Sequence, residues 1–201
     1  MSYAVRNAER GFTQIEVLVA MGIAGIVIAA ITMTYITQQK LYAAQANVTE
    51  MFQATRAAMD MLSREIRMAG YGPTRASFDG VTYNTNTAQI QIKADLDGDG
   101  STTGANENII YSYDAANHRL DRNAGSGNQP VAENIQAFAI EYKKQDGSAA
   151  TTSAEIRQIK ITITGRTSTP DPNYPSNGGY RTYALTSLVT PTNLFYSDYT
   201  R

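Results

Sequence analysis

An uninterrupted apolar run near the N-terminus restricts the fold more than any other feature of this sequence. The twenty residues from Val17 to Ile36, VLVAMGIAGIVIAAITMTYI, include no charged residue and no proline. Twenty helical residues rise about 30 Å, which matches the hydrocarbon core of a bilayer. The run therefore predicts a helix that can cross a membrane. Because Arg6 and Arg10 precede it, the positive-inside tendency places residues 1–11 in the cytoplasm and the chain after Gln38 on the opposite side.

The helical pattern continues beyond the apolar run. Apolar residues recur at steps of three and four from Leu41 to Ala69. The charged residues of this segment are expected on the other faces of the helix: Arg56, Asp60, Arg64, Glu65 and Arg67. Gly70-Tyr71-Gly72-Pro73 then supplies a stop signal. We therefore predict one helix from about Thr13 to Ala69, on the order of 80 Å long, whose second half offers one apolar stripe to a folded domain.

After Pro73 the apolar residues follow the two-residue period of β-strands. Apolar and polar residues alternate around Ile90, Ile140 and Ile161, as in half-buried antiparallel strands. Further strands are predicted around Val81 and over 109–113, 118–122 and 181–189, with turns or loops over 123–128, 146–148 and 168–179. A chain of 201 residues suits one globular domain with an extension. The predicted fold class is α+β, with the outer half of the long N-terminal helix packed against one face of an antiparallel sheet.

Composition excludes several classes of function. The chain has no cysteine, so disulfides, thiolate metal sites and thiol nucleophiles are excluded. Its net charge of −1 provides no field that would attract nucleic acid. His118 is the only histidine, and its place in a predicted hairpin turn indicates an ordinary surface residue. The sequence contains no phosphate-binding loop and no nucleophile elbow, so we expect no enzymatic activity.

The start of the apolar run carries the most informative motif. Gly11-Phe12-Thr13-Gln14-Ile15-Glu16 leads directly into Val17-Leu18-Val19-Ala20. This stretch resembles the class III signal sequence of type IV prepilins and type II secretion pseudopilins, although Gln14 stands where leucine is common. The resemblance implies that prepilin peptidase cleaves after Gly11, that the new N-terminal Phe12 is N-methylated, and that Glu16 is needed for assembly.

The residues themselves also give Glu16 a physical role. A carboxylate at the edge of an apolar span costs roughly a few kcal/mol unless it finds a partner. Cleavage after Gly11 would free the amine of Phe12 about one helical turn from Glu16. In a staggered bundle the same amine could equally meet Glu16 of a neighbour, and this pair would set the axial register between subunits. The span also contains small residues that allow close helix packing, namely Ala20, Gly22, Ala24, Gly25 and Ala29.

The resemblance extends beyond the leader. Residues 60–71, DMLSREIRMAGY, are similar to the L-x-R-E-I-R-x-A-G-Y stretch of PilW-like minor pilins and PulJ/GspJ-like minor pseudopilins. Residues 131–144 and 156–164 fit the same group, whereas Pro191-Thr192-Asn193 departs from its usual Arg-Asn ending. The membrane half of the helix contains no proline, unlike that of many major pilins. We therefore expect a minor subunit, and the resemblance implies a place in the priming complex at the filament tip.

These features together predict the organisation of the chain. Residues 1–11 form a leader peptide, 12–38 a helix half for the membrane or the filament core, and 39–201 an extracytoplasmic α+β domain. The precursor is expected to be a single-pass protein of the inner membrane and later a part of a pilus or pseudopilus. The implied partners are other pilin subunits, prepilin peptidase, an inner-membrane assembly platform and, before assembly, the lipid bilayer.

An acidic loop is the candidate metal site of the sequence. Residues 95–101, DLDGDGS, have the D-x-D-x-D-G opening of a calcium loop, in which alternate carboxylates converge and glycine permits a sharp turn. The twelfth position is Asn106, so the nearest acid comes one residue late. The candidate ligands are Asp95, Asp97, Asp99, Ser101 and Glu107. We predict a structural Ca²⁺ here, with an acidic, solvated turn as the alternative.

Two other readings stay open. Ala44-Gln45-Ala46 matches a signal peptidase I site, so the N-terminus could serve only for export and the mature chain would start at Asn47. The protein would then be a secreted or membrane-tethered adhesion domain stabilised by calcium. Several tyrosines could stack on a glycan or on DNA, namely Tyr174, Tyr180, Tyr183, Tyr196 and Tyr199. Strand packing and ordinary surface positions explain these tyrosines better, because no basic patch accompanies them.

Overall fold

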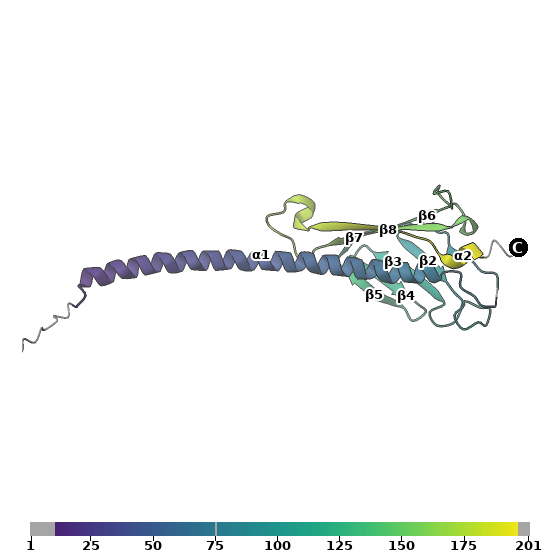
Figure 1. Ribbon diagram of the computed structural model, residues 1–201, viewed down its shortest axis with the longest axis horizontal. Helices are drawn as coiled ribbons and strands as arrows, with labels where there is room; N and C mark the ends of the chain where they lie inside the picture. Colours follow the sequence, from purple (N-terminus) through teal and green to yellow (C-terminus); the bar gives the residue numbers. More distant parts are fainter. Residues whose placement is uncertain (1–10, 75, 197–201) are drawn as a thin grey trace, which may run out of the picture. The chain divides into compact units, whose positions relative to one another are not determined.

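The computed structural model describes residues 11–74 and 76–196. The chain divides into two compact units, Met1–Gln45 and Ala46–Arg201, and helix α1 (Gln14–Met68) contributes to both (Figure 1). The expected basic leader residues Arg6 and Arg10 lie outside the described residues. Each unit is described separately below.

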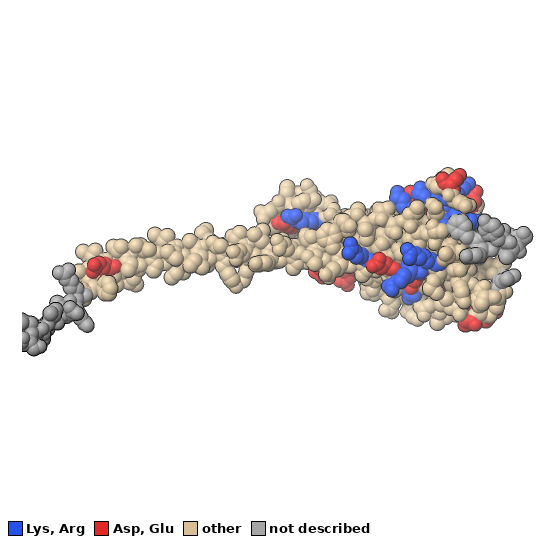
Figure 2. All heavy atoms as spheres, viewed as in Figure 1, with Lys and Arg blue, Asp and Glu red and all other residues tan. Residues whose placement is uncertain are grey.

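The first unit is an exposed, apolar helix. The bounds of α1 lie within one residue of the predicted ones, and the helix is long and apolar enough to cross a membrane. Figure 2 shows a surface almost without charge along this segment. The hydroxyls of Thr32, Thr34 and Thr37 donate to the carbonyl oxygens four residues earlier, at 2.8, 3.0 and 2.9 Å. These hydroxyls are thus satisfied within the helix, as a hydrocarbon environment requires.

The second unit combines the C-terminal part of α1 with two antiparallel sheets (Figure 1). The first sheet consists, in spatial order, of β1 (Val81–Thr82), β2 (Gln89–Lys93), β3 (Asn108–Asp114), β4 (Arg119–Asn123) and β5 (Asn128–Glu133). The second consists of β6 (Ile135–Lys143), β7 (Gln158–Arg166) and β8 (Thr182–Val189). Two short 3₁₀ helices (Ser153–Glu155 and Ser176–Gly179) lie in the loops, and α2 (Thr192–Tyr196) follows β8.

The division into two sheets differs from the single sheet that we predicted. Between β5 and β6 the chain passes through Asn134, which has a left-handed φ of 56°. Asparagine adopts this conformation more readily than most residues, and the chain changes sheet there. The backbone N–H of Ile135 donates at 2.8 Å to His118 O, in the turn that joins β3 and β4 of the first sheet. Asn134 O accepts from Arg166 N of the second sheet, also at 2.8 Å, so this one turn joins both sheets.

The apolar stripe of α1 forms the core together with the inner faces of both sheets. Leu62 and Ile66 of α1 are completely buried, as are Ile90 of β2, Leu120 of β4 and Ile161 of β7. Along β7, buried and partly exposed residues alternate without interruption, which confirms the two-residue period seen in the sequence. Each fully buried Leu or Ile contributes about 1.5–3 kcal/mol relative to an exposed one. Packing on α1 therefore stabilises both sheets.

Candidate functional site

The first residues of α1 form a reciprocal hydrogen-bonded cap. The backbone N–H and the hydroxyl of Thr13 donate to Glu16 Oε2 at 2.8 and 2.9 Å. In return, the backbone N–H of Glu16 donates to Thr13 Oγ1 at 3.3 Å. This is a capping box, in which Thr13 is the N-cap and Glu16 the third helical residue. The sequence interpretation assigned no role to Thr13, although the Thr-x-x-Glu spacing was a sufficient signal for one.

The same end of α1 carries a shallow groove on its surface. It is lined by Phe12, Glu16, Val17, Ala20, Met21 and Ala24. The structure thus brings together two of the predicted site residues, because the expected new N-terminus and the expected assembly carboxylate face one hollow. Phe12 is 88% exposed. The small side chains of Ala20 and Ala24 leave room for a second helix to approach along this face.

The acidic loop is folded around the buried carboxylate of Asp95. Its Oδ1 accepts from the backbone N–H of Gly98 at 2.7 Å. Its Oδ2 accepts from the N–H of Gly100 at 3.1 Å and from the hydroxyl of Thr74 at 2.9 Å. Both glycines have positive φ angles, 80° and 84°, which other residues rarely adopt. Asp95 therefore fixes the turn that the two glycines permit.

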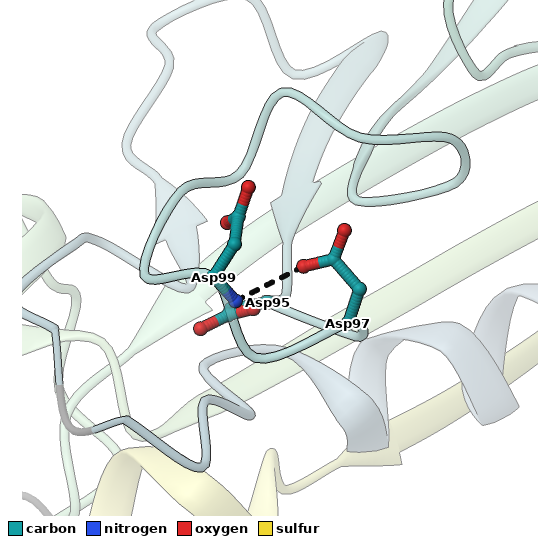
Figure 3. Close-up of side chains that lie close together, drawn as sticks. All are labelled: Asp95, Asp97 and Asp99. Carbon is teal, nitrogen blue, oxygen red and sulfur yellow. Dashed lines mark hydrogen bonds between the residues drawn. The ribbon is translucent and has the colours of Figure 1, made fainter.

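Asp97 and Asp99 present their carboxylates to solvent in the same loop (Figure 3). Asp97 Oδ1 accepts from the N–H of Asp99 at 3.1 Å, and Asp99 Oδ1 accepts from the N–H of Ser101 at 2.7 Å. One carboxylate oxygen from each of these two residues and from Asp95 lies within 4.8 Å of the others. The geometry would suit a hard cation, which prefers oxygen ligands.

Glu107 is engaged differently from the ligand role that the sequence suggested. Its side chain is buried, and it accepts backbone hydrogen bonds from Leu96 at 2.8 Å, Asp97 at 3.2 Å and Gly104 at 2.7 Å. The hydrogen bond from the Leu96 N–H is the main reason that the pKa of this carboxyl is lowered. The side chain of Glu107 thus closes the loop by accepting hydrogen bonds from backbone N–H groups of the loop. Calcium binding by Asp95, Asp97, Asp99, Ser101 and Glu107 stays a prediction.

Calcium binding is predicted to raise the melting temperature of the full-length protein in detergent. Millimolar CaCl₂ should shift the transition upwards, because an ion bound only by the folded state stabilises it. The Asp97→Asn/Asp99→Asn double variant should lose this shift yet melt like the wild type without calcium, since both side chains are exposed. Equal amounts of MgCl₂ serve as the ionic control. A wild-type melting temperature that does not respond to calcium would contradict the prediction.

A third group of residues, at the C-terminal end of α1, ties the helix to the first sheet. Glu65 Oε1 lies 2.9 Å from Arg122 Nη2 and 3.0 Å from Arg122 Nε. Glu65 Oε2 accepts from the hydroxyl of the fully buried Tyr111 at 2.6 Å. Arg122 also donates to Asn106 Oδ1 at 3.1 Å. The prediction that Glu65 faces away from the core is therefore wrong, whereas Arg56, Asp60, Arg64 and Arg67 are exposed as expected.

The residues after Glu65 end the helix. Gly70 has a φ of 78°, and its N–H donates to Lys93 O at 2.9 Å. The hydroxyl of Thr192, at the start of α2, donates to Arg67 O at 3.1 Å. The stretch 60–71 thus has a structural explanation, since it supplies core residues, the Glu65 network and a left-handed stop.

Buried tyrosines predict a loss of stability at alkaline pH. Burial raises the pKa of Tyr142 to about 12, and burial together with the nearby Glu65 raises that of Tyr111. An unfolded tyrosine titrates near pH 10, so the contribution of both tyrosines is complete below pH 10; that of Tyr142 is lost as the pH rises towards 12. For Tyr142 alone, urea unfolding should show a decrease of about 2 kcal/mol by pH 12, which is the part that Tyr142→Phe removes. Tyr142→Phe should reduce this slope, and an unchanged slope would contradict the assignment.

The remaining candidates fit structural roles. His118 lies in the turn between β3 and β4 with a φ of 50°. The Arg181 and Arg166 guanidinium groups stack over the rings of Tyr174 and Tyr180, and Tyr183 contacts Phe52 with ring centroids 4.3 Å apart. Tyr199 lies outside the described residues, as does the side chain of Tyr196. Tyr174, Tyr180 and Tyr183 are therefore engaged in contacts within the domain.

Comparisons with known proteins address the chain as a whole. The family described as prepilin peptidase-dependent protein B matches residues 44–183, and the prokaryotic N-terminal methylation motif matches residues 6–32. No curated protein sequence matches the chain. Among solved structures, the chain is similar to a type IV-like pilin from Thermus thermophilus, with a TM-score of 0.47 and 13% sequence identity. That alignment covers 71% of this chain and 97% of the pilin.

Proposed function

The chain belongs to the prepilin peptidase-dependent protein B family, and we propose that it is a minor subunit of a type IV pilus or of a type II secretion pseudopilus. A subunit of this kind is cleaved between Gly11 and Phe12 and methylated on Phe12. It then enters the filament through its apolar helix and makes contacts rather than catalysing a reaction.

One observation carries this proposal. Phe12 and Glu16 line a single groove at the start of an exposed apolar helix, directly after the glycine of the processing motif. The N-terminal methylation motif covers the same residues. An amine freed at Phe12 is a natural counter-charge for Glu16, whether within one subunit or between two. The pair would offset the cost of a carboxylate in an apolar surrounding and fix the position of one helix along another.

The topology follows from the charge distribution. The basic leader stays in the cytoplasm and the domain from residue 39 onwards lies outside, so the precursor is a single-pass protein of the inner membrane. Prepilin peptidase and an assembly platform act on it there, and other pilin subunits replace the lipid around α1 during assembly. The apolar, exposed surface of the first unit suits both surroundings.

The proposal of a minor subunit rests on the absence of proline from the membrane half and on the similarity of residues 60–71 to minor pilins. Quantitative mass spectrometry of purified filaments tests it. The protein should be present at less than about one hundredth of the main subunit, while deletion of its gene should strongly reduce filament number. A protein that makes up most of the filament mass would instead be a major subunit.

A further inference from the structure

Strand β8 forms an open edge of the second sheet. The sheet has the order β6-β7-β8, and β6 is covered on its other side, where Ile140 N–H donates at 2.8 Å to Thr87 O in the turn before β2. For β8 the only backbone partner among residues 11–74 and 76–196 is β7. One long edge of this sheet is therefore free in the described part of the chain.

The ladder geometry shows which backbone groups of β8 point outwards. Just before β8, the backbone N–H of Thr167 donates to Arg181 O at 2.9 Å, which makes 167 and 181 a hydrogen-bonded pair. In an antiparallel ladder, hydrogen-bonded pairs alternate with pairs that are not. The registered pairs Gly165–Tyr183, Ile163–Leu185, Ile161–Ser187 and Ile159–Val189 are therefore hydrogen-bonded. The N–H and C=O groups of the four residues between them face away from β7, namely Thr182, Ala184, Thr186 and Leu188.

This edge lacks the features that usually prevent strand pairing. Exposed edges normally carry charges, proline or a bulge, because free ladder groups attract other strands. The edge strand β5 has such features: it contains Pro130 and the exposed Glu133, and its register with β4 shifts between Leu120 and Asp121. The sequence of β8, TYALTSLV, contains no charge, proline or glycine over eight residues. Leu188 on this strand is 55% exposed.

We propose that β8 accepts an extended, uncharged segment of a different protein of the assembly as a fourth strand of the sheet. Main-chain hydrogen bonds to the four outward residues would hold the segment, and its own side chains would cover the partly exposed Tyr183 and Leu185. An uncharged partner fits because a charged side chain opposite this edge would be desolvated without a counter-charge.

A second copy of this chain does not fit the edge, given the topology proposed above. A symmetric β8–β8 ladder has its two-fold axis perpendicular to the strands, which makes the two strands antiparallel. Tyr183 of β8 contacts Phe52, and Thr192 beyond β8 donates to Arg67 O, so β8 runs along the part of α1 after Ala46 (Figure 1) and this axis would also reverse one of the two helices. Subunits that are inserted in the membrane in the same orientation keep their helices parallel, so they cannot form this antiparallel β8–β8 pair. The other edge strands in the described part of the chain are poorer acceptors of a further strand. Strand β1 has only two residues, β5 carries Pro130 and Glu133, and β6 is covered.

Hydrogen exchange on the full-length protein in detergent tests the proposal, with a synthetic peptide of residues 181–190, RTYALTSLVT, as the probe. The free peptide is not inserted in a membrane, so its orientation is not fixed. It can therefore pair antiparallel with β8, with residue 182 of one strand opposite 188 of the other and 184 opposite 186. Saturating peptide should slow exchange of the amides of Thr182, Ala184, Thr186 and Leu188 by about tenfold or more. The inward amides of Leu185 and Ser187 should be slow throughout, and a scrambled peptide should change nothing.

Two proline variants make the test specific. Thr186→Pro removes an outward N–H that the fold does not use, and edge strands tolerate proline in this position. It should melt within a few degrees of the wild type yet lose the protection by peptide. Leu185→Pro removes an inward N–H and should melt much lower. The proposal is overturned if the outward amides are already protected without peptide, if peptide slows none of them, or if Thr186→Pro binds peptide like the wild type.

A cellular measurement separates this inference from the proposed function. Thr186→Pro should be processed and membrane-inserted normally but should lower filament number at least several-fold. If Thr186→Pro supports normal filaments while Glu16→Ala does not, the fourth-strand proposal fails and the assignment as a pilus subunit stands. If neither variant affects filaments, the proposed function fails as well.

Discussion

Replacing Glu16 with alanine is expected to prevent incorporation of the protein into filaments without preventing its processing. The carboxylate is the only charged group between Gly11 and Gln39, so in an apolar bundle it is the only partner available there for a freed Phe12 amine. Removing one partner of a buried ion pair costs about 3–5 kcal/mol. This cost corresponds to about a 100-fold or larger fall in the assembly equilibrium. Immunoblots of sheared filaments and of membranes measure incorporation and processing separately.

Thr13 provides a matched control for this experiment. Thr13→Ala removes the cap hydrogen bonds at the same helix end but leaves the Glu16 charge in place. Loss of an N-cap costs about 1 kcal/mol, so incorporation should decrease only about fivefold. Filament incorporation of Glu16→Ala at the wild-type level would refute the role in register. Equal defects in Thr13→Ala and Glu16→Ala would show that the helix cap, rather than the charge, is what matters.

Replacing Glu65 with alanine is expected to destabilise the second unit more than any other exchange of a single charged residue considered above. The change leaves Arg122 without its carboxylate and the buried hydroxyl of Tyr111 without an acceptor. The side chains of Glu65 and Arg122 are only 20% and 17% exposed. Breaking a fully buried pair costs about 3–5 kcal/mol, and this partial exposure lowers the expected loss to about 2–4 kcal/mol. Urea unfolding followed by near-ultraviolet circular dichroism of the tyrosines measures it.

Glu141 is the matched control for Glu65. It pairs with Lys160 at 2.6 Å on the exposed face of the second sheet, and its side chain is 50% exposed. Exposed ion pairs contribute about 0–1 kcal/mol, so Glu141→Ala should hardly change the urea midpoint. Glu65→Gln should fall between the two, because the amide oxygen can still accept from Tyr111. A loss for Glu65→Ala as small as that for Glu141→Ala would contradict the role assigned to the network.

The elements with a clear periodicity could be predicted from the sequence. The helix bounds came within one residue because the apolar stripe of α1 and the left-handed Gly70 are local signals. The strands around Ile90, Ile140 and Ile161 followed from alternation. The division into two sheets was not predicted. The break between β5 and β6 depends on one asparagine, Asn134, whose conformation is decided by hydrogen bonds to residues distant in sequence.

The candidate site shows the same limit. Gly11, Phe12 and Glu16 could be named because the processing motif is contiguous, and the acidic loop because its carboxylates alternate. The inward position of Glu65 could not be derived, since its partners Tyr111 and Arg122 come from strands 46 and 57 residues away. Glu107 closes the acidic loop through backbone N–H groups of residues 96, 97 and 104, which the sequence does not display. Long-range partners are thus what the sequence conceals.

The mature N-terminus tests the central claim most directly. Mass spectrometry of the protein purified from wild-type cells should give a chain that starts at Phe12 and carries one methyl group on its amine. Cells lacking prepilin peptidase should retain residues 1–11. A mature chain that starts at Asn47, or a precursor that stays uncleaved when the peptidase is present, would contradict the account.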